Sequence, residues 1–172
     1  MLNFIKHRDH ALMLRIHHWE APDWLRLVMV AATRAGDGWL WYGLGLMILI
    51  AGDQERVAAV FAGTASTSIG LIIYAITKKA TRRTRPCLVE PNRWAHILPP
   101  DQYSFPSGHT IAAFAITLSV GVFYPALFMP LLLAAMLIAT SRVLLGMHYL
   151  SDVIAGMLLG GALGHLAYRL LG

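Results

Sequence analysis

The chain has 172 residues, of which 57% are hydrophobic and only 13% are charged, and its formal net charge is +5. The charged fraction is about half that of a soluble globular domain, which argues against an ordinary water-soluble enzyme. Several apolar runs approach the roughly 20 residues that are needed to cross a bilayer. We therefore predict an all-α, polytopic membrane protein with a single domain, 1–172.

The first 35 residues predict helices that lie on the membrane surface. Residues 3–19 place apolar side chains at helical spacing among lysines and arginines, as interfacial helices do. Pro22 marks the start of a second short helix, Asp23 to Ala35, whose apolar middle is too short to span. Four histidines in the first helix lack the cysteine or carboxylate partners of a metal site. The segment Gly36-Asp37-Gly38 then breaks the helix.

The remainder, 36–172, is predicted to be the transmembrane catalytic core with about five spans. The apolar runs are 39–51, 57–77, 108–123, 126–145 and 152–171. The first of these is short for a full span. In the last run, a face for close helix contact is predicted by small residues at every fourth position, Gly156, Gly160 and Gly164, with Gly161 alongside.

A long polar segment, 78–107, interrupts the apolar runs, and its five prolines exclude a continuous helix. Its aromatic and apolar residues Trp94, Ile97, Tyr103 and Phe105 predict a loop that packs onto the membrane surface. Trp94 and Tyr103 are expected to border a lateral entrance for a lipid chain.

Basic residues concentrate in 1–34 and 78–93, which favours an anionic partner such as lipid headgroups or a phosphorylated substrate. Nucleic acid is a poor alternative, because these residues are not interleaved with stacking aromatics on a soluble surface. The alternation of spans places three polar segments on one side of the membrane: the basic segment after Lys78, the turn before His109, and residues 142–152.

The first two of these segments each have an ordinary explanation, as a positive-inside loop and as a helix N-cap turn. Together, the three segments predict a phosphate site. The start of a helix after Pro106-Ser107-Gly108 offers free N–H groups to an anion. His148 and Asp152 are four residues apart, which lets a carboxylate orient an imidazole if a helix begins near His148.

The spacing of these motifs resembles that of a known family. Lys78 is followed by Arg85-Pro86, then by Pro106-Ser107-Gly108-His109, and then by Ser141-Arg142 with His148 and Asp152. This pattern resembles the three-part signature of the type 2 phosphatidic acid phosphatase superfamily. That superfamily includes membrane lipid phosphatases, glucose-6-phosphatase and the vanadium haloperoxidases.

The resemblance implies a role for each motif residue in a two-step phosphoryl transfer. His148 would attack phosphorus and form a phosphohistidine, Asp152 would orient it, and His109 would act as general acid and then base. The phosphate would be held by the side chains of Lys78, Arg85 and Arg142, the Ser107 hydroxyl and the Gly108 N–H. No metal or other cofactor is expected. A metal bound by His109, His148 and Asp152 is the minor alternative, disfavoured by the three neighbouring cations.

A lipid phosphate in the bilayer is the expected substrate, with undecaprenyl diphosphate, phosphatidylglycerol phosphate and phosphatidic acid as candidates. The alternatives are a lipid-linked phosphotransferase, a vanadium haloperoxidase and a non-enzymatic anion transporter. The resemblance implies a multi-pass protein of the bacterial inner membrane whose active site faces the periplasm or exterior, whereas the positive-inside rule alone favours the cytoplasm. The usual membrane form has six spans, and here the N-terminal helices replace the first.

Overall fold

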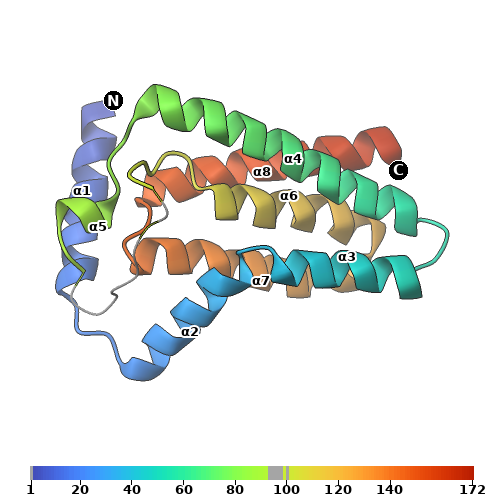
Figure 1. The fold of residues 1–172 in the computed structure, drawn as a ribbon, viewed down its shortest axis with the longest axis horizontal. Helices are drawn as coiled ribbons and strands as arrows, with labels where there is room; N and C mark the ends of the chain where they lie inside the picture. Colours follow the sequence, from blue (N-terminus) through green and yellow to red (C-terminus); the bar gives the residue numbers. More distant parts are fainter. Residues whose placement is uncertain (1, 93–98, 100) are drawn as a thin grey trace.

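The structure is a computed structural model that describes residues 2–92, 99 and 101–172. These residues form eight helices: α1 (Leu2–His18), α2 (Asp23–Ala35), α3 (Trp39–Ala51), α4 (Arg56–Thr81), α5 (Pro86–Val89), α6 (Gly108–Phe123), α7 (Pro125–Leu144) and α8 (Leu150–Leu171). The predicted all-α membrane bundle is confirmed, with α3, α4, α6, α7 and α8 running along its length (Figure 1).

Helix α6 is the central helix of the bundle. It packs most extensively against α8 and also against α4 and α7. Its side chains are buried almost continuously from Thr110 to Gly121, as expected for a helix that is apolar on all sides and enclosed by neighbours. The first turn of α6, which carries Gly108 and His109, is therefore placed at one end of the bundle among the ends of the surrounding helices.

Among the residues that the structure describes, three helices, α4, α7 and α8, have the length and hydropathy to cross a membrane, whereas α3 and α6 are shorter apolar helices. The 13 residues of α3 extend about 20 Å, less than the roughly 30 Å of a hydrocarbon core. Large apolar side chains face outward along the bundle, among them Phe61, Ile72 and Leu158, each at least 60% exposed. Such a surface is suited to lipid.

Helix α1 runs across one end of the bundle, transverse to the long helices (Figure 1). It would therefore lie along the membrane surface if the long helices cross it, as the sequence predicted. Its buried side chains are Asp9, Met13 and His17, which recur every four residues and so form one face. That face is turned toward the end of the bundle, where α1 contacts both α7 and α8.

The predicted glycine face lies where α8 packs on α6. A Cβ atom at Gly160 would lie 2.3 Å from the Ile111 carbonyl oxygen, and one at Gly164 would lie 2.3 Å from that of Ala115. Gly161 faces open space instead and takes no part in this contact. Glycine thus lets the two helix backbones approach closely.

The structure differs from the prediction in two segments. Helix α8 begins at Leu150, two residues before the predicted start, with Tyr149 at its N-cap. The polar segment 78–107 contains the single turn of α5, and an isolated bridge joins Thr84 to Tyr103. The predicted surface contacts of Trp94 and Ile97 lie outside the described residues.

Candidate active site

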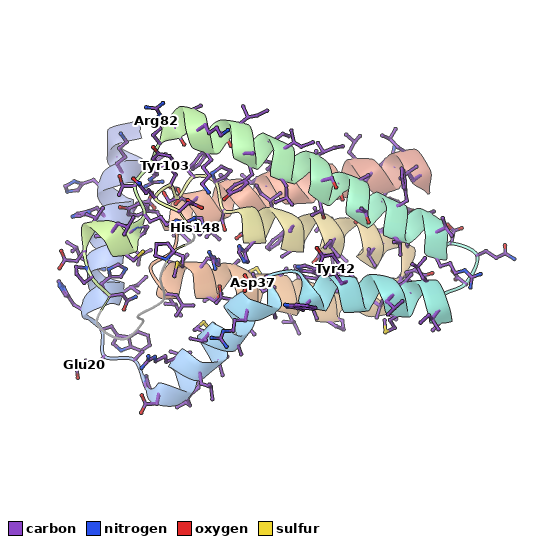
Figure 2. All side chains as sticks on the ribbon, viewed as in Figure 1. Glu20, Asp37, Tyr42, Arg82, Tyr103 and His148 are labelled. Carbon is purple, nitrogen blue, oxygen red and sulfur yellow. The ribbon has the colours of Figure 1, made fainter. Side chains whose placement is uncertain are left out.

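The polar groups that the sequence predicted to converge lie at one end of the bundle, beside the transverse helix α1. Figure 2 shows His148, Tyr103 and Arg82 at this end, whereas Tyr42 lies farther along α3. The contributing segments are the end of α4, the segment before α5, the start of α6, the end of α7 and the turn into α8. All of them except the segment before α5 lie at the ends of α4, α6, α7 or α8, so the packing of these long helices fixes their positions.

His148 lies in the short turn between α7 and α8 and is 3% exposed. Its Nδ1 atom is 2.5 Å from the carbonyl oxygen of Ser104. Because a carbonyl only accepts hydrogen bonds, Nδ1 carries the proton and Nε2 holds the lone pair. Nε2 lies 3.2 Å from Nη1 of Arg85. The ring is therefore held with its unprotonated nitrogen beside a cation.

The surroundings of His148 favour its neutral form. Burial lowers the pKa of His148 to about 4, the nearby Asp152 carboxylate opposes that shift, and Arg142 and Arg85 add to it. A neutral imidazole keeps the Nε2 lone pair available to react at physiological pH.

Asp152 is fully buried and lies close to His148, but it does not orient the ring by a hydrogen bond. The distance from its Oδ2 to Nδ1 of His148 is 3.8 Å, which exceeds a hydrogen bond. Its Oδ2 accepts instead from the Tyr149 backbone N–H at 2.9 Å, and its Oδ1 accepts from Nη1 of Arg83 at 2.6 Å. The expected bond is absent because α8 starts at Leu150, so His148 is not on the helix that carries Asp152.

Arg83 belongs to the basic segment after Lys78 but was not among the predicted site residues, and it joins this group to α1. Its Nη1 also donates to Ser151 Oγ at 2.7 Å, and its Nη2 donates to Oδ2 of Asp9 at 2.7 Å. Its guanidinium stacks over the Tyr149 ring, 4.0 Å from the centroid. Arg83 therefore lies between the carboxylates of Asp9 and Asp152.

Arg85 is 1% exposed and is fixed by several acceptors. Its Nε donates to the Asp101 carbonyl at 2.8 Å, its Nη1 to the Met147 carbonyl at 3.0 Å, and its Nη2 to Asp101 Oδ1 at 3.1 Å. Lys78 pairs with Oδ2 of the same carboxylate and donates to the Tyr74 hydroxyl. Burial disfavours the charge of Asp101, but the bonds from Lys78, the Tyr103 N–H and Arg85 outweigh it and lower the pKa of Asp101.

Arg142 is 5% exposed and projects from the last turn of α7. Its Nη1 donates to the hydroxyl of Thr33 from α2. Its Nε is buried and has no hydrogen-bond partner among the residues that the structure describes. An unsatisfied guanidinium N–H is costly in a buried site unless a ligand accepts its hydrogen bond.

Ser107 and Gly108 form the start of α6. Ser107 is buried, its N–H donates to the Asp152 carbonyl at 3.2 Å, and its hydroxyl accepts from Thr110 at 2.9 Å. Gly108 lies against the ring of Tyr74, which a Cβ atom would approach to 3.4 Å. The backbone at the start of α6 thus faces the other polar groups with little side-chain bulk.

His109, the next residue, pairs with Asp37 from the turn between α2 and α3. Its Nε2 lies 2.7 Å from Oδ1 of Asp37. A Cβ atom at Gly36 would come within 2.9 Å of the His109 ring. The turn at 36–38, predicted only as a helix break, is therefore a wall of the site and supplies a carboxylate to it.

A cavity of about 530 Å³ connects these groups to the apolar part of the bundle. At its polar end it is lined by Arg85, Gly108, His109, Arg142 and His148. It continues between α3, α4 and α6, past Trp41, Tyr42, Leu44, Ile48, Val60, Leu71 and Ile116. Lys78, Ser107 and Asp152 are not among the residues that line it. The aromatic residues on its walls are Trp41, Tyr42 and Tyr74, whereas Tyr103, which was expected at an entrance, pairs with Thr84.

A family model described as the PAP2 superfamily matches residues 57–172. The match covers more than half of the chain and contains every motif residue from Lys78 to Asp152. The chain belongs to the PAP2 superfamily. This match, together with the phosphatase relatives described next, confirms the expectation of a phosphoric ester hydrolase.

Relatives of this chain include proteins named as phosphatases of lipid-linked substrates. Decaprenylphosphoryl-5-phosphoribose phosphatase of Mycobacterium tuberculosis (strain H37Rv) is 36% identical over 128 residues, 72% of this chain and 67% of that protein. Undecaprenyl-diphosphatase of Sulfolobus acidocaldarius is 27% identical over 145 residues, 83% of this chain and 69% of that protein.

Two solved structures share the fold. A transmembrane PAP2 type phosphatidylglycerolphosphate phosphatase from Bacillus subtilis superposes with a TM-score of 0.77 at 23% identity, covering 98% of this chain and 86% of that chain. Aquifex aeolicus LpxE superposes with a TM-score of 0.70 at 24% identity, covering 92% of this chain and 93% of that chain. The PAP2 model leaves α1, α2 and α3 outside its match. Three residues of that N-terminal region contact motif residues or their partners, namely Asp9, Thr33 and Asp37.

Proposed function

We propose that this protein removes phosphate from a polyprenyl-linked phosphate or diphosphate through a phosphohistidine on His148. The observation that carries the proposal is the cavity that joins His148 and His109 to an apolar groove between α3, α4 and α6. Such a cavity accommodates a charged headgroup at one end and a hydrocarbon chain along the rest.

In the first step, the Nε2 lone pair of His148 forms a bond to phosphorus while the bond from phosphorus to the leaving oxygen breaks. The proton on Nδ1 stays hydrogen-bonded to the Ser104 carbonyl. Protonated His109 gives its proton to the leaving oxygen. Since Nε2 of His109 faces Asp37, Nδ1 is the nitrogen that exchanges this proton.

In the second step, His109 takes a proton from water, the water oxygen bonds to phosphorus, and the bond from His148 to phosphorus breaks. Inorganic phosphate and the starting form of the enzyme result. Arg85 and Arg142, both at the polar end of the cavity, stabilise the charge on the transferring phosphoryl group. Lys78 pairs with Asp101, which in turn fixes Arg85, so Lys78 also supports the site through Asp101, and its direct contact with phosphate stays a prediction.

The choice of a polyprenyl chain has two supports. The groove is built from branched and aromatic side chains of short and long helices, which suits a bulky hydrocarbon. Two relatives that each match more than two thirds of this chain are named for decaprenyl and undecaprenyl substrates. Phosphatidylglycerol phosphate and phosphatidic acid are the comparison substrates.

The test is phosphate release by the purified protein in detergent, from undecaprenyl diphosphate, phosphatidylglycerol phosphate, phosphatidic acid and the chain-free ester p-nitrophenyl phosphate. We expect the polyprenyl substrate to give the highest kcat/KM, with activity unchanged by a chelator and lost in H148A. Phosphate from a labelled substrate should become bound to the wild type as an acid-labile adduct. Full activity in H148A overturns the nucleophile, and a preference for the glycerolipids overturns the choice of chain.

We further propose that the site end of the bundle faces the periplasm or cell exterior. Glu20 is exposed near this end (Figure 2), and Gln54 is exposed in the α3–α4 turn at the other end of the bundle (Figure 1). In a Cys87→Ala background, E20C is expected to react with a membrane-impermeant thiol reagent in intact cells, while Q54C reacts only after lysis. The reverse pattern would place the site in the cytoplasm.

A further inference from the structure

Asp9 is a buried carboxylate on α1, outside the region that the PAP2 model matches. Its side chain is 6% exposed. Its Oδ1 accepts from the Ser151 N–H at 3.1 Å, and its Oδ2 accepts from the Ser151 hydroxyl and from Nη2 of Arg83 at 2.7 Å. A carboxylate is buried this deeply only when charged and polar partners compensate for lost water.

The partners of Asp9 lead directly to the group beside the proposed nucleophile. Arg83 donates through one nitrogen to Asp9 and through the other to Asp152, at 2.7 Å and 2.6 Å. Asp152 lies 3.8 Å from His148. Asp9 and His148 also line the same small cavity beneath α1. A single residue, Arg83, thus links the Asp9 carboxylate on α1 to the Asp152 carboxylate.

The charges in this chain of contacts decide the electrostatics at His148. Arg83 alone would neutralise Asp152, and the carboxylate would then do little for a positive imidazole. With Asp9 on its other side, one cation is shared by two anions, and the cluster keeps a net negative charge.

We propose that Asp9 is a positioning residue that orients Arg83 and keeps the Arg83–Asp152 cluster negative, so that the phosphorylated form of His148 is stabilised. The inference rests on the proposed phosphohistidine chemistry. When Nε2 of His148 bonds to phosphorus, the ring still carries its Nδ1 proton and becomes positively charged. A negative neighbour favours that state over the neutral ring, and therefore accelerates its formation.

A purely structural role for Asp9 predicts a different result. The inner face of α1 also carries Met13 and His17, which are 4% and 1% exposed and would still pack in a variant at position 9. Asparagine has nearly the same shape as aspartate and retains an oxygen that accepts from Ser151. If packing alone mattered, D9N would retain wild-type turnover.

The test compares the kcat and KM of D9N with those of the wild type on the preferred substrate. We expect kcat to fall about tenfold, as for other residues that support a catalytic group, with KM within about twofold of wild type. D9E, which keeps the charge, should recover part of the loss. D23N is the matched control, because Asp23 is an exposed carboxylate in the first turn of α2 and the charge change is identical.

A second comparison uses R83Q. In that background no guanidinium neutralises Asp152 or links it to Asp9, so D9N should lower kcat by a clearly smaller factor in R83Q than in the wild type. Unchanged kcat in D9N, or an equal loss from D9N in both backgrounds, overturns the proposal. If D9N alone fails to fold, R83Q/D9N is compared with R83Q, and a loss of tenfold or more in the double variant overturns the proposal. Phosphate release by the wild type and by H148A tests the proposed function separately. If the proposed function is wrong, these two proteins release phosphate equally, whatever D9N does.

Discussion

The Nε2 atom of His109 lies 2.7 Å from Oδ1 of Asp37, which comes from a turn 72 residues earlier in the chain. Because a carboxylate only accepts, this contact fixes the proton on Nε2 and the orientation of the ring. The carboxylate also opposes the burial of the ring and the neighbouring cations Arg142 and Arg85, all of which favour the neutral imidazole. We expect D37N to lower kcat roughly 10- to 100-fold.

The matched control for this prediction is D53N. Asp53 is an exposed aspartate that also accepts a hydrogen bond, from Tyr124 at 3.0 Å, but it lies in the turn between α3 and α4. The same loss of charge at the far end of the bundle should leave phosphate release unchanged. If D37N and D53N show equal activity, Asp37 does not support His109 in catalysis.

The close contact between α6 and α8 predicts that two neighbouring glycines of α8, Gly160 and Gly161, differ in how well they tolerate substitution by alanine. G160A would place a methyl group 2.3 Å from the Ile111 carbonyl oxygen, within a helix backbone that cannot move aside cheaply. Overpacking of this kind typically costs about 1–3 kcal/mol. G161A adds the same methyl group to open space. We expect the unfolding temperature in detergent to fall for G160A and not for G161A, and equal temperatures would contradict the observed packing.

The convergence of the motif residues could be predicted because it depends on span alternation. Lys78, His109 and residues 142–152 each follow or precede an apolar run, so the order of crossings places them on one side. The glycine spacing in α8 likewise predicted a contact face, because every fourth residue of a helix lies on one side. Gly161 was grouped with that face although its position, one residue on, points it elsewhere.

The contributions of Asp9, Thr33 and Asp37 could not be predicted in this way. Each lies in the N-terminal region and reaches the site only through the tertiary packing of α1 and α2, which leaves no periodic signal in the sequence. The sequence spacing also could not predict that His148 and Asp152 lie too far apart for a hydrogen bond. A spacing of four residues brings side chains together only within a helix, and α8 begins after His148.

The environment of His148 predicts how this side chain titrates. Burial lowers its pKa to about 4, from an ordinary value of 6.5. The ring should therefore stay neutral as the pH falls through 6.5, and Nε2 should take up a proton only near pH 4. In NMR spectra of histidine-labelled protein in detergent, the ring signals that are absent from H148A should not shift between pH 8 and about 5.5. A titration midpoint near 6.5 would contradict the buried, neutral ring.

The apolar groove predicts a substitution that separates long-chain from chain-free substrates. Gly45 lines the cavity, and a Cβ atom there would meet nothing within 4 Å, so G45L projects new bulk into the groove without disturbing α3. Gly43 has equally open surroundings but does not line the cavity, which makes G43L the matched control. We expect G45L to raise KM about tenfold or more for undecaprenyl diphosphate, since a blocked pocket loses the burial of several methylene groups. For p-nitrophenyl phosphate, both variants should match the wild type, because that ester needs only the polar end. Equal KM values for G45L and G43L on the polyprenyl substrate would show that the chain binds elsewhere.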